Sequence, residues 1–106
     1  MKNASQKGIY TINELREKLT PVFSSAPIYK AILFGSYAKG EADSESDIDI
    51  VIDSRRELIN LAFYGVATSV EEAVGKRVDL LEISQIQKDA PIMQSILSEG
   101  IVLYER

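Results

Sequence analysis

Two acidic residues in one apolar stretch have a spacing that suits metal chemistry. Asp47 and Asp49 lie two residues apart in the sequence DIDIVID, which alternates as a strand does. Alternate side chains of a strand point to the same face, so the two carboxylates share a face. Carboxylates in an apolar strand are costly to desolvate unless a cation neutralises them. Because Mg²⁺ prefers carboxylate oxygen and completes its shell with phosphates and water, the pair predicts a magnesium and phosphate site.

A glycine and a serine upstream suit the phosphate. Gly35 and Ser36 follow the apolar run IYKAILF and open a short turn or helix that closes near Gly40. Backbone N–H groups at the start of a helix bind phosphate oxygens, glycine lets the backbone approach closely, and serine adds a hydroxyl donor. Asp79, in the apolar run RVDLLEI, is the candidate third carboxylate. It would hold a second metal ion or accept the proton of an attacking hydroxyl.

These residues also have structural interpretations. Gly35-Ser36 alone would be an ordinary turn, and Asp47 with Asp49 would suit the solvated face of an edge strand. Asp79 would instead pair with a neighbouring basic residue, Lys76 or Arg77. The combination of all these residues favours the metal and phosphate site.

Other polar and aromatic residues near the motif leave alternatives open. Asp53 shares the face of Asp49 but sits at the strand end, where it suits a turn. Tyr37 and Lys39 either contact nucleotide or lie on the surface. Phe63 and Tyr64 are surplus apolar residues on a predicted helix, and they suit a partner interface.

Composition narrows the possible chemistry. The chain has 106 residues, 45% hydrophobic and 26% charged, which suits one globular domain. It has no histidine and no cysteine, so serine triads, disulfides and the common zinc sites are excluded. The net charge of −4 argues against nonspecific nucleic-acid binding. There is no apolar run near the ~18 residues of a membrane span and no signal-peptide core, so we expect a cytoplasmic protein.

The elements that must position these residues follow from periodicity. Residues 1–10 are polar and expected to be flexible, so the domain is assigned to 11–106. Thr11 and Glu14 form a predicted capping box, and Pro21 should kink or shorten the helix that follows. The expected strands are 28–34, 47–53, 77–83 and 101–105, and the longer helices after the first are 55–74, stopped by Gly75, and 90–99. This order predicts a small α/β or α+β domain with one sheet.

The stretch GSYAKGEADSESDIDIVID resembles the signature of the DNA polymerase β-like nucleotidyltransferase superfamily, Gly-Ser followed by a polar loop and Asp-x-Asp. The short chain and the runs Gly-Ser-Tyr-Ala and Ser-Asp-Ile-Asp-Ile most resemble its minimal nucleotidyltransferase branch. The resemblance implies a single domain with a small mixed sheet flanked by helices. It implies nucleotide binding by Gly35, Ser36 and Lys39, although many relatives have arginine at the last position, whose bidentate fork lysine lacks. It implies that the catalytic and metal-binding residues, for two Mg²⁺ ions, are Asp47, Asp49 and Asp79.

The resemblance also implies a reaction and a partner. A hydroxyl attacks the α-phosphate of a nucleoside triphosphate, expected to be ATP, and pyrophosphate is released. Members of the minimal branch often act as antitoxins beside a helical HEPN-domain partner, and some transfer AMP to a tyrosine of that partner. Two alternatives stay open: a non-catalytic antitoxin that neutralises its partner by complex formation, and nucleotidylation of a small molecule such as an aminoglycoside. A homo-oligomer would supply the pocket walls that the small molecule needs.

Overall fold

The sheet is mixed and has four strands. The structure is a computed structural model that describes residues 8–106. The strands are β1 (Lys30–Phe34), β2 (Ile48–Asp53), β3 (Val78–Glu82) and β4 (Ile101–Glu105), in the sheet order β3-β2-β1-β4. β1 pairs antiparallel with β2 and β4, whereas β2 and β3 are parallel. The predicted single mixed sheet is confirmed, and β2 lies in its interior.

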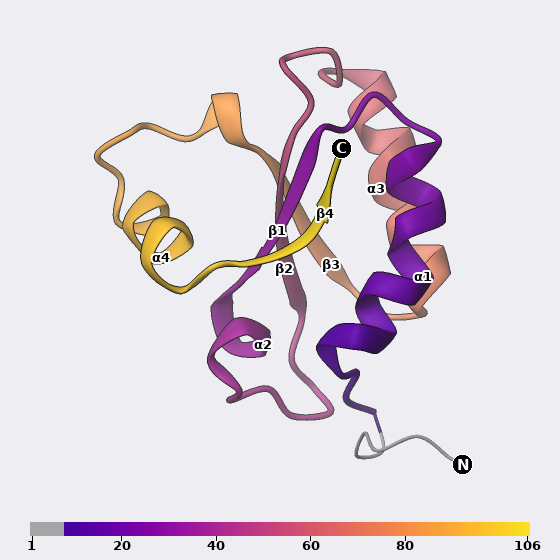
Figure 1. Cartoon of the computed structure of the whole chain (residues 1–106), viewed down its shortest axis with the longest axis vertical. Helices are drawn as coiled ribbons and strands as arrows, with labels where there is room; N and C mark the ends of the chain where they lie inside the picture. The colour runs from indigo at the N-terminus through magenta and orange to yellow at the C-terminus, as the bar shows by residue number, and fades with distance from the viewer. Residues whose placement is uncertain (1–7) are drawn as a thin grey trace.

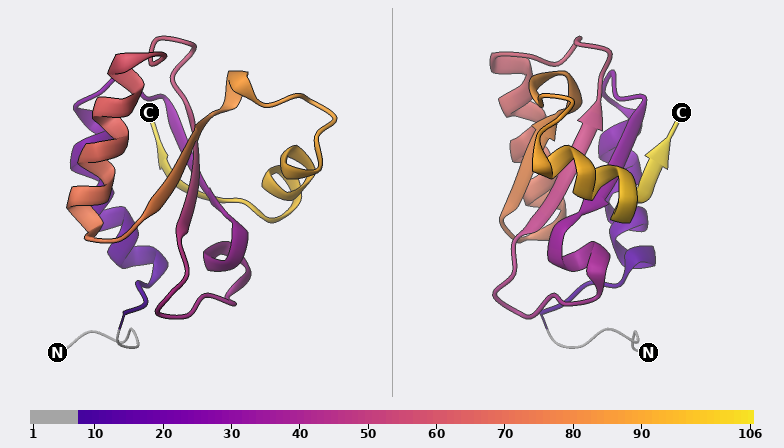
Figure 2. Two further views of the ribbon diagram at one scale, coloured as in Figure 1. Left: turned by 180° about the vertical axis from the view of Figure 1, so that it is seen from behind. Right: turned by 90° about the vertical axis from the view of Figure 1, so that its left-hand side faces the viewer.

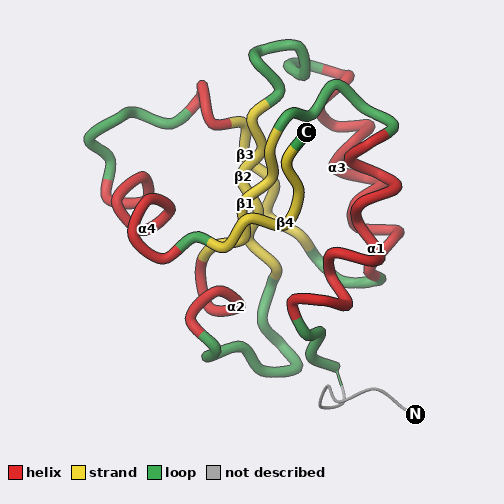
Figure 3. The backbone as a smooth tube through the Cα atoms, in the orientation of Figure 1, coloured by secondary structure: helices red, strands yellow, loops and turns green. Residues whose placement is uncertain are grey.

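Helices cover both faces of this sheet. They are α1 (Ile12–Ser24), α2 (Gly35–Lys39), α3 (Leu61–Val74) and α4 (Pro91–Glu99), with a short 3₁₀ turn, η1 (Ile83–Gln85), after β3. α1 and α3 lie side by side on one face, and α2 and α4 lie on the other (Figures 1 and 2). Figure 3 shows the strands as one layer between these two helical layers. Within residues 8–106, no helix has the length and apolar character needed to cross a membrane.

The alternation of β2 separates the main core from the opposite face. Ile48, Ile50 and Ile52 are fully buried in the core that α1 and α3 cover. Val51 points the other way and packs in a smaller cluster with Ile96 of α4. The residues that alternate with the isoleucines therefore lie on the face of α2 and α4, as the period of two predicts.

The first helix begins as its sequence predicts. The backbone N–H of Thr11 donates to Glu14 Oε1 (2.8 Å), and the N–H of Glu14 donates to Thr11 Oγ1 (3.1 Å), which completes the capping box. Pro21 lies inside α1, and the helix continues to Ser24. Pro21 therefore does not shorten the helix, and the alternative that it kinks the helix stays a prediction.

The third helix begins later than its sequence predicts. The expected start is Arg55, but α3 starts at Leu61. Arg55 and Arg56 have left-handed backbone (φ 52° and 66°), so the chain turns before the helix starts. The stop at Gly75 (φ 66°) is confirmed.

A buried carboxylate explains that turn. Glu82, at the end of β3, is 2% exposed and accepts from the N–H and hydroxyl of Ser54 (2.8 and 2.5 Å) and of Ser84 (2.7 and 2.5 Å). The Ser54 hydroxyl in turn accepts from the N–H of Leu58 (3.0 Å). Burial alone would raise the pKa of Glu82, but the hydrogen bonds from Ser54 and Ser84 outweigh it and hold the pKa below its usual value. Glu82 thus ties the ends of β2 and β3 together.

Replacing this carboxylate is expected to weaken the fold. Glu82→Gln keeps the shape but loses the charge-assisted bonds and places an amide N–H₂ against donors, so we expect a loss of about 2 kcal/mol in the free energy of unfolding. Urea unfolding at neutral pH measures it. The matched control is Glu57→Gln, because Glu57 is exposed and its carboxylate accepts from the Tyr29 hydroxyl (2.8 Å) at the surface. Equal denaturation midpoints for the two variants would contradict the role of Glu82.

Candidate active site

The glycine-serine turn lies directly against the carboxylate of Asp49. β1 runs into α2 at Gly35, whose backbone is left-handed (φ +73°). Phe34, the last residue of β1, is paired with Asp49 of β2. A Cβ added to Gly35 would overlap the Oδ2 atom of Asp49. Only glycine provides both the backbone angle and the space at this position.

Asp49 and Asp79 form a carboxylate pair. They occupy paired positions of the parallel strands β2 and β3, so their side chains lie on the same face of the sheet. Burial raises the pKa of Asp49 to about 6, and the charge and hydrogen bonding of Asp79 add to the rise. The predicted proximity of these two residues is confirmed. Two carboxylates this close ionise together only when a cation offsets their repulsion, so the donor set fits a hard divalent ion.

Asp47 lies just before the strand that carries Asp49. It immediately precedes β2, and its charge makes the smallest contribution to the raised pKa of Asp49. Among residues 8–106, no three acidic side chains form a group that could hold a metal ion as they lie. The structure therefore pairs Asp49 with Asp79, and Asp47 acts on Asp49 through its charge. Because β2 is an interior strand, the edge-strand interpretation of Asp47 and Asp49 is wrong.

The loop before Asp47 is held by its own side chains and by one lysine. The Asp43 carboxylate accepts from the N–H of Glu45 (2.9 Å) and from the hydroxyl of Ser46 (3.2 Å). Lys76 Nζ donates to the carbonyl oxygen of Ser44 (3.1 Å) and to that of Gly8 (2.8 Å). Lys76 is therefore directed at the loop, which disfavours its predicted alternative as the partner of Asp79.

Lys39 and Tyr37 each had a surface alternative, and only Lys39 lies at the surface. Lys39 Nζ lies 3.9 Å from Glu99 Oε1, so the lysine links α2 to α4. No local sequence pattern predicts this contact, because Glu99 is far from Lys39 in the sequence. Tyr37 is only 5% exposed and packs in the main core, so its surface alternative is wrong.

Asp53 has the structural role that its position predicts. Its Oδ1 accepts from the N–H of Arg55 (2.9 Å) and closes a turn after β2. The chemistry of the site therefore centres on the turn at Gly35 and on the pair formed by Asp49 and Asp79. This arrangement places backbone donors beside two carboxylates, which together suit a metal-bound phosphate.

The comparison with known families agrees with this geometry. The family model described as "Polymerase beta, Nucleotidyltransferase" matches residues 17–106. The chain belongs to this nucleotidyltransferase family. A relative from Methanocaldococcus jannaschii, provisionally named a protein adenylyltransferase, is 33% identical over 91 residues, which are 85% of this chain and 95% of that protein. Its size and similarity confirm the resemblance to the minimal branch, and the chain is a nucleotidyltransferase enzyme.

Several solved structures of similar fold are described as parts of toxin–antitoxin systems. One, described as a toxin–antitoxin with AMP-PNP, is 25% identical with a TM-score of 0.74, over 86% of this chain and 73% of that one. Another, described as a tri-AMPylated Shewanella oneidensis HEPN toxin in complex with its MNT antitoxin, has a TM-score of 0.69 at 21% identity, over 91% of this chain and 74% of that one. The second likeness concerns the fold alone. Together they confirm the α/β nucleotidyltransferase fold predicted for this chain.

Proposed function

We propose that this nucleotidyltransferase uses Mg²⁺ to transfer AMP from ATP to a hydroxyl group of a HEPN-type protein partner, with release of pyrophosphate. The observation that carries the proposal is the packing of the Gly35 turn against the Asp49 and Asp79 carboxylates. It is supported by the relative named an adenylyltransferase and by the toxin–antitoxin structure described with AMP-PNP. We place the reaction in the cytoplasm, where ATP is available.

Each predicted residue has a role in this proposal. The backbone after Gly35 and the hydroxyl of Ser36 donate hydrogen bonds to the triphosphate. Asp49 and Asp79 hold Mg²⁺, and Asp47, at the start of β2, completes the carboxylate set. Bound Mg²⁺ neutralises phosphate charge and polarises the phosphoryl oxygens.

The transfer step is an in-line displacement. The acceptor hydroxyl oxygen forms a bond to the α-phosphorus, and the bond from that phosphorus to the pyrophosphate oxygen breaks. Asp79 takes the hydroxyl proton, because it lies on the edge strand β3 and is exposed to an incoming acceptor. Lys39 exchanges its contact with Glu99 for an outer phosphate of ATP.

Intact-mass spectrometry of a HEPN-type partner tests the proposal. The partner is incubated with the chain, ATP and Mg²⁺, and a mass increase of one or more AMP units is expected. The Asp49→Asn variant should give no increase. If the partner is neutralised in cells without any mass increase, the chain acts as a non-catalytic antitoxin and the proposed reaction is wrong.

The titration of Asp49 is expected to respond to the bound metal. In the free protein, its carboxyl ¹³C signal should titrate with a midpoint near the pKa of about 6. Mg²⁺ with a non-hydrolysable ATP analogue should move the midpoint to lower pH, because the metal binds the ionised form. The variant Asp79→Asn should lower the midpoint of the free protein only in part, since burial is the larger cause. If the midpoint of Asp49 does not change when Mg²⁺ and the analogue are added, the assignment of Asp49 as a metal ligand is wrong.

A further inference from the structure

Lys76 joins two segments that are far from it in the chain. Its Nζ donates to the carbonyl oxygen of Ser44 (3.1 Å), in the loop that leads to Asp47, and to that of Gly8 (2.8 Å), ahead of α1. Gly8 also packs directly on Ser44, because a Cβ added to Gly8 (φ +81°) would lie 2.9 Å from the Cβ of Ser44. We call Gly8, Ser44 and Lys76 the Ser44 junction.

Asp47 lies between two points at which its loop is attached to the segment before β3. On one side, Lys76 donates to Ser44. On the other side, the N–H of Ile48 donates to the carbonyl oxygen of Arg77 (3.1 Å), the residue next to Lys76. The bonds among the loop's own side chains shape the loop but do not attach it to this segment. A loop that is fixed on both sides of Asp47 leaves that residue fewer conformations.

The charge of the loop gives the lysine a second effect. Residues 41–47 have the sequence EADSESD, which contains four acidic residues and no basic one. This loop leads into β2, where Asp49 is paired with Asp79. Like charges repel one another, so the loop is favoured to move away from the carboxylate pair into solvent. The ammonium group of Lys76, bonded to the loop backbone, offsets part of this repulsion.

We infer that Lys76 is a positioning residue for the metal site: through Ser44, it holds the loop so that Asp47 stays available to the Mg²⁺ of the carboxylate pair. This role rests on the proposed Mg²⁺-dependent transfer and adds to it a residue that acts through the loop backbone. The location of Lys76 suits the role, because it lies in the short connection between α3 and β3, and its backbone is therefore fixed from both sides. Groups that orient metal ligands without touching the metal affect metal affinity strongly.

The variant Lys76→Met tests this role, because methionine keeps much of the side-chain length and removes the charge and the donors. The affinity for a non-hydrolysable ATP analogue is measured by calorimetry at increasing concentrations of free Mg²⁺. The Mg²⁺ concentration that gives half of the maximal affinity should rise about 10-fold in Lys76→Met. It should largely return in Lys76→Arg, which keeps the charge and the donors. The control Lys88→Met removes the same charge from an exposed position after η1 and should leave this concentration unchanged.

Hydrogen exchange gives a readout that needs neither metal nor transfer. The amide hydrogens of residues 43–47 should exchange faster in Lys76→Met than in Lys88→Met, because the loop loses an attachment. The amides of β2 and β3 should exchange equally in the two variants, and the urea denaturation midpoints should also be equal. A general loss of stability would instead change all of these quantities together.

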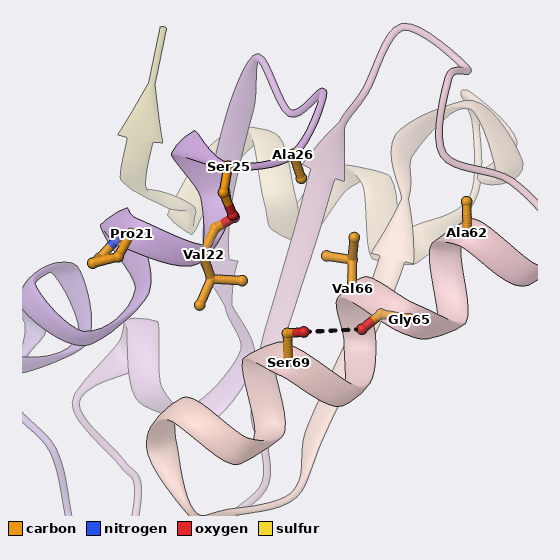
Figure 4. Close-up of a pocket in the computed structure, with 8 residues that line it drawn as sticks. All are labelled: Pro21, Val22, Ser25, Ala26, Ala62, Gly65, Val66 and Ser69. Atoms are coloured by element: carbon orange, nitrogen blue, oxygen red, sulfur yellow. Dashed lines mark hydrogen bonds between the residues drawn. The ribbon is translucent and has the colours of Figure 1, made fainter.

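The variant Gly8→Ala disturbs the same junction from the other side. Its methyl group would meet the Cβ of Ser44, and its left-handed backbone would be strained, so the required Mg²⁺ concentration should rise even if Lys76→Met does not fold. The matched control is Gly65→Ala, because a Cβ added there meets nothing within 4 Å. Figure 4 shows Gly65 at the recess between α1 and α3, where the Ser69 hydroxyl donates to its carbonyl oxygen (3.2 Å). This control should bind Mg²⁺ as the unmodified chain does.

The results of these experiments distinguish the role of Lys76 from the proposed function. If the unmodified chain binds the analogue without Mg²⁺, or not at all, the proposed function is wrong and the role of Lys76 falls with it. If the unmodified chain requires Mg²⁺ but Lys76→Met and Lys88→Met need equal concentrations of it, only the role of Lys76 is wrong. A defect that Lys76→Arg does not restore, or equal exchange of residues 43–47 in Lys76→Met and Lys88→Met, would also overturn this role.

Discussion

The Asp49→Asn variant is expected to lose nucleotidyl transfer by roughly 10³-fold while becoming more stable at neutral pH. Asp49 is the carboxylate that contacts both the Gly35 turn and Asp79. The neutral amide removes the charge that Mg²⁺ requires, so transfer falls. It also removes the cost of burying the charge and the repulsion between Asp49 and Asp79, so the fold gains stability. A residue that costs stability and supports activity is typical of a functional site.

The pH dependence gives the sign of the stability effect. The folded pKa of Asp49, about 6, lies above its ordinary value of 3.8, so the native state binds the proton more tightly than the unfolded chain does. The protonated Asp49 carboxyl therefore contributes its full stabilisation below pH 3.8. This contribution falls as the pH rises from 3.8 to about 6, and it is lost above about 6. The Asp49→Asn variant should lack this decrease.

Thermal unfolding across this pH interval, together with a transfer assay, measures both effects. The matched control is Asp53→Asn, which lies on the same strand and keeps an oxygen to accept from Arg55. It should retain transfer and show little change in stability. An Asp49→Asn protein that is folded and fully active would show that Asp49 does not bind the metal.

The Gly35→Ala variant should destabilise the fold by about 2–4 kcal/mol, because a left-handed alanine is strained and its Cβ overlaps the Asp49 carboxylate. The overlap can be relieved by a shift of the turn or by a displacement of Asp49. Either change separates the backbone donors for phosphate from the carboxylates. Transfer should therefore fall even in the folded fraction of the protein. Urea unfolding and a transfer assay at saturating ATP measure the two effects.

Gly40→Ala is the matched control for this variant. Gly40 has nearly the same backbone angle (φ +74°), but an added Cβ meets nothing within 4 Å. Its substitution should therefore show the backbone strain alone, about 1 kcal/mol. The difference between the two variants isolates the contact with Asp49. Equal losses would mean that Gly35 is required only for its backbone angle.

The sequence alone predicted correctly those features of the fold that depend on interactions between residues close together in the chain. The capping box of Thr11 and Glu14 and the stop at Gly75 depend on residues within one or two turns, and both are confirmed. The alternation of β2 placed its aspartates opposite to its isoleucines. Asp79 was expected near them because it lies in a further apolar run, but its exact pairing with Asp49 follows from the parallel register of β2 and β3, which alternation alone does not predict.

The remaining features depend on contacts between distant residues. The turn before α3 is held by Glu82, which lies 28 positions from Ser54. The helical pattern of 58–74 continues smoothly into that turn, so it predicts too early a start. Lys39 meets Glu99 only because α2 and α4 share a face of the sheet. The loop before Asp47 also receives a hydrogen bond from the distant Lys76, at the carbonyl oxygen of Ser44.

Calorimetric titration of the purified chain with ATP, with and without Mg²⁺, tests the central claim most directly. GTP, CTP and UTP in parallel define the base preference, and Asp49→Asn reports on the carboxylate pair. We predict binding of ATP that requires Mg²⁺ and is lost in Asp49→Asn. Binding that is indifferent to Mg²⁺, or that is kept by Asp49→Asn, would contradict the assignment of Gly35, Asp49 and Asp79 as a site for a metal-bound triphosphate.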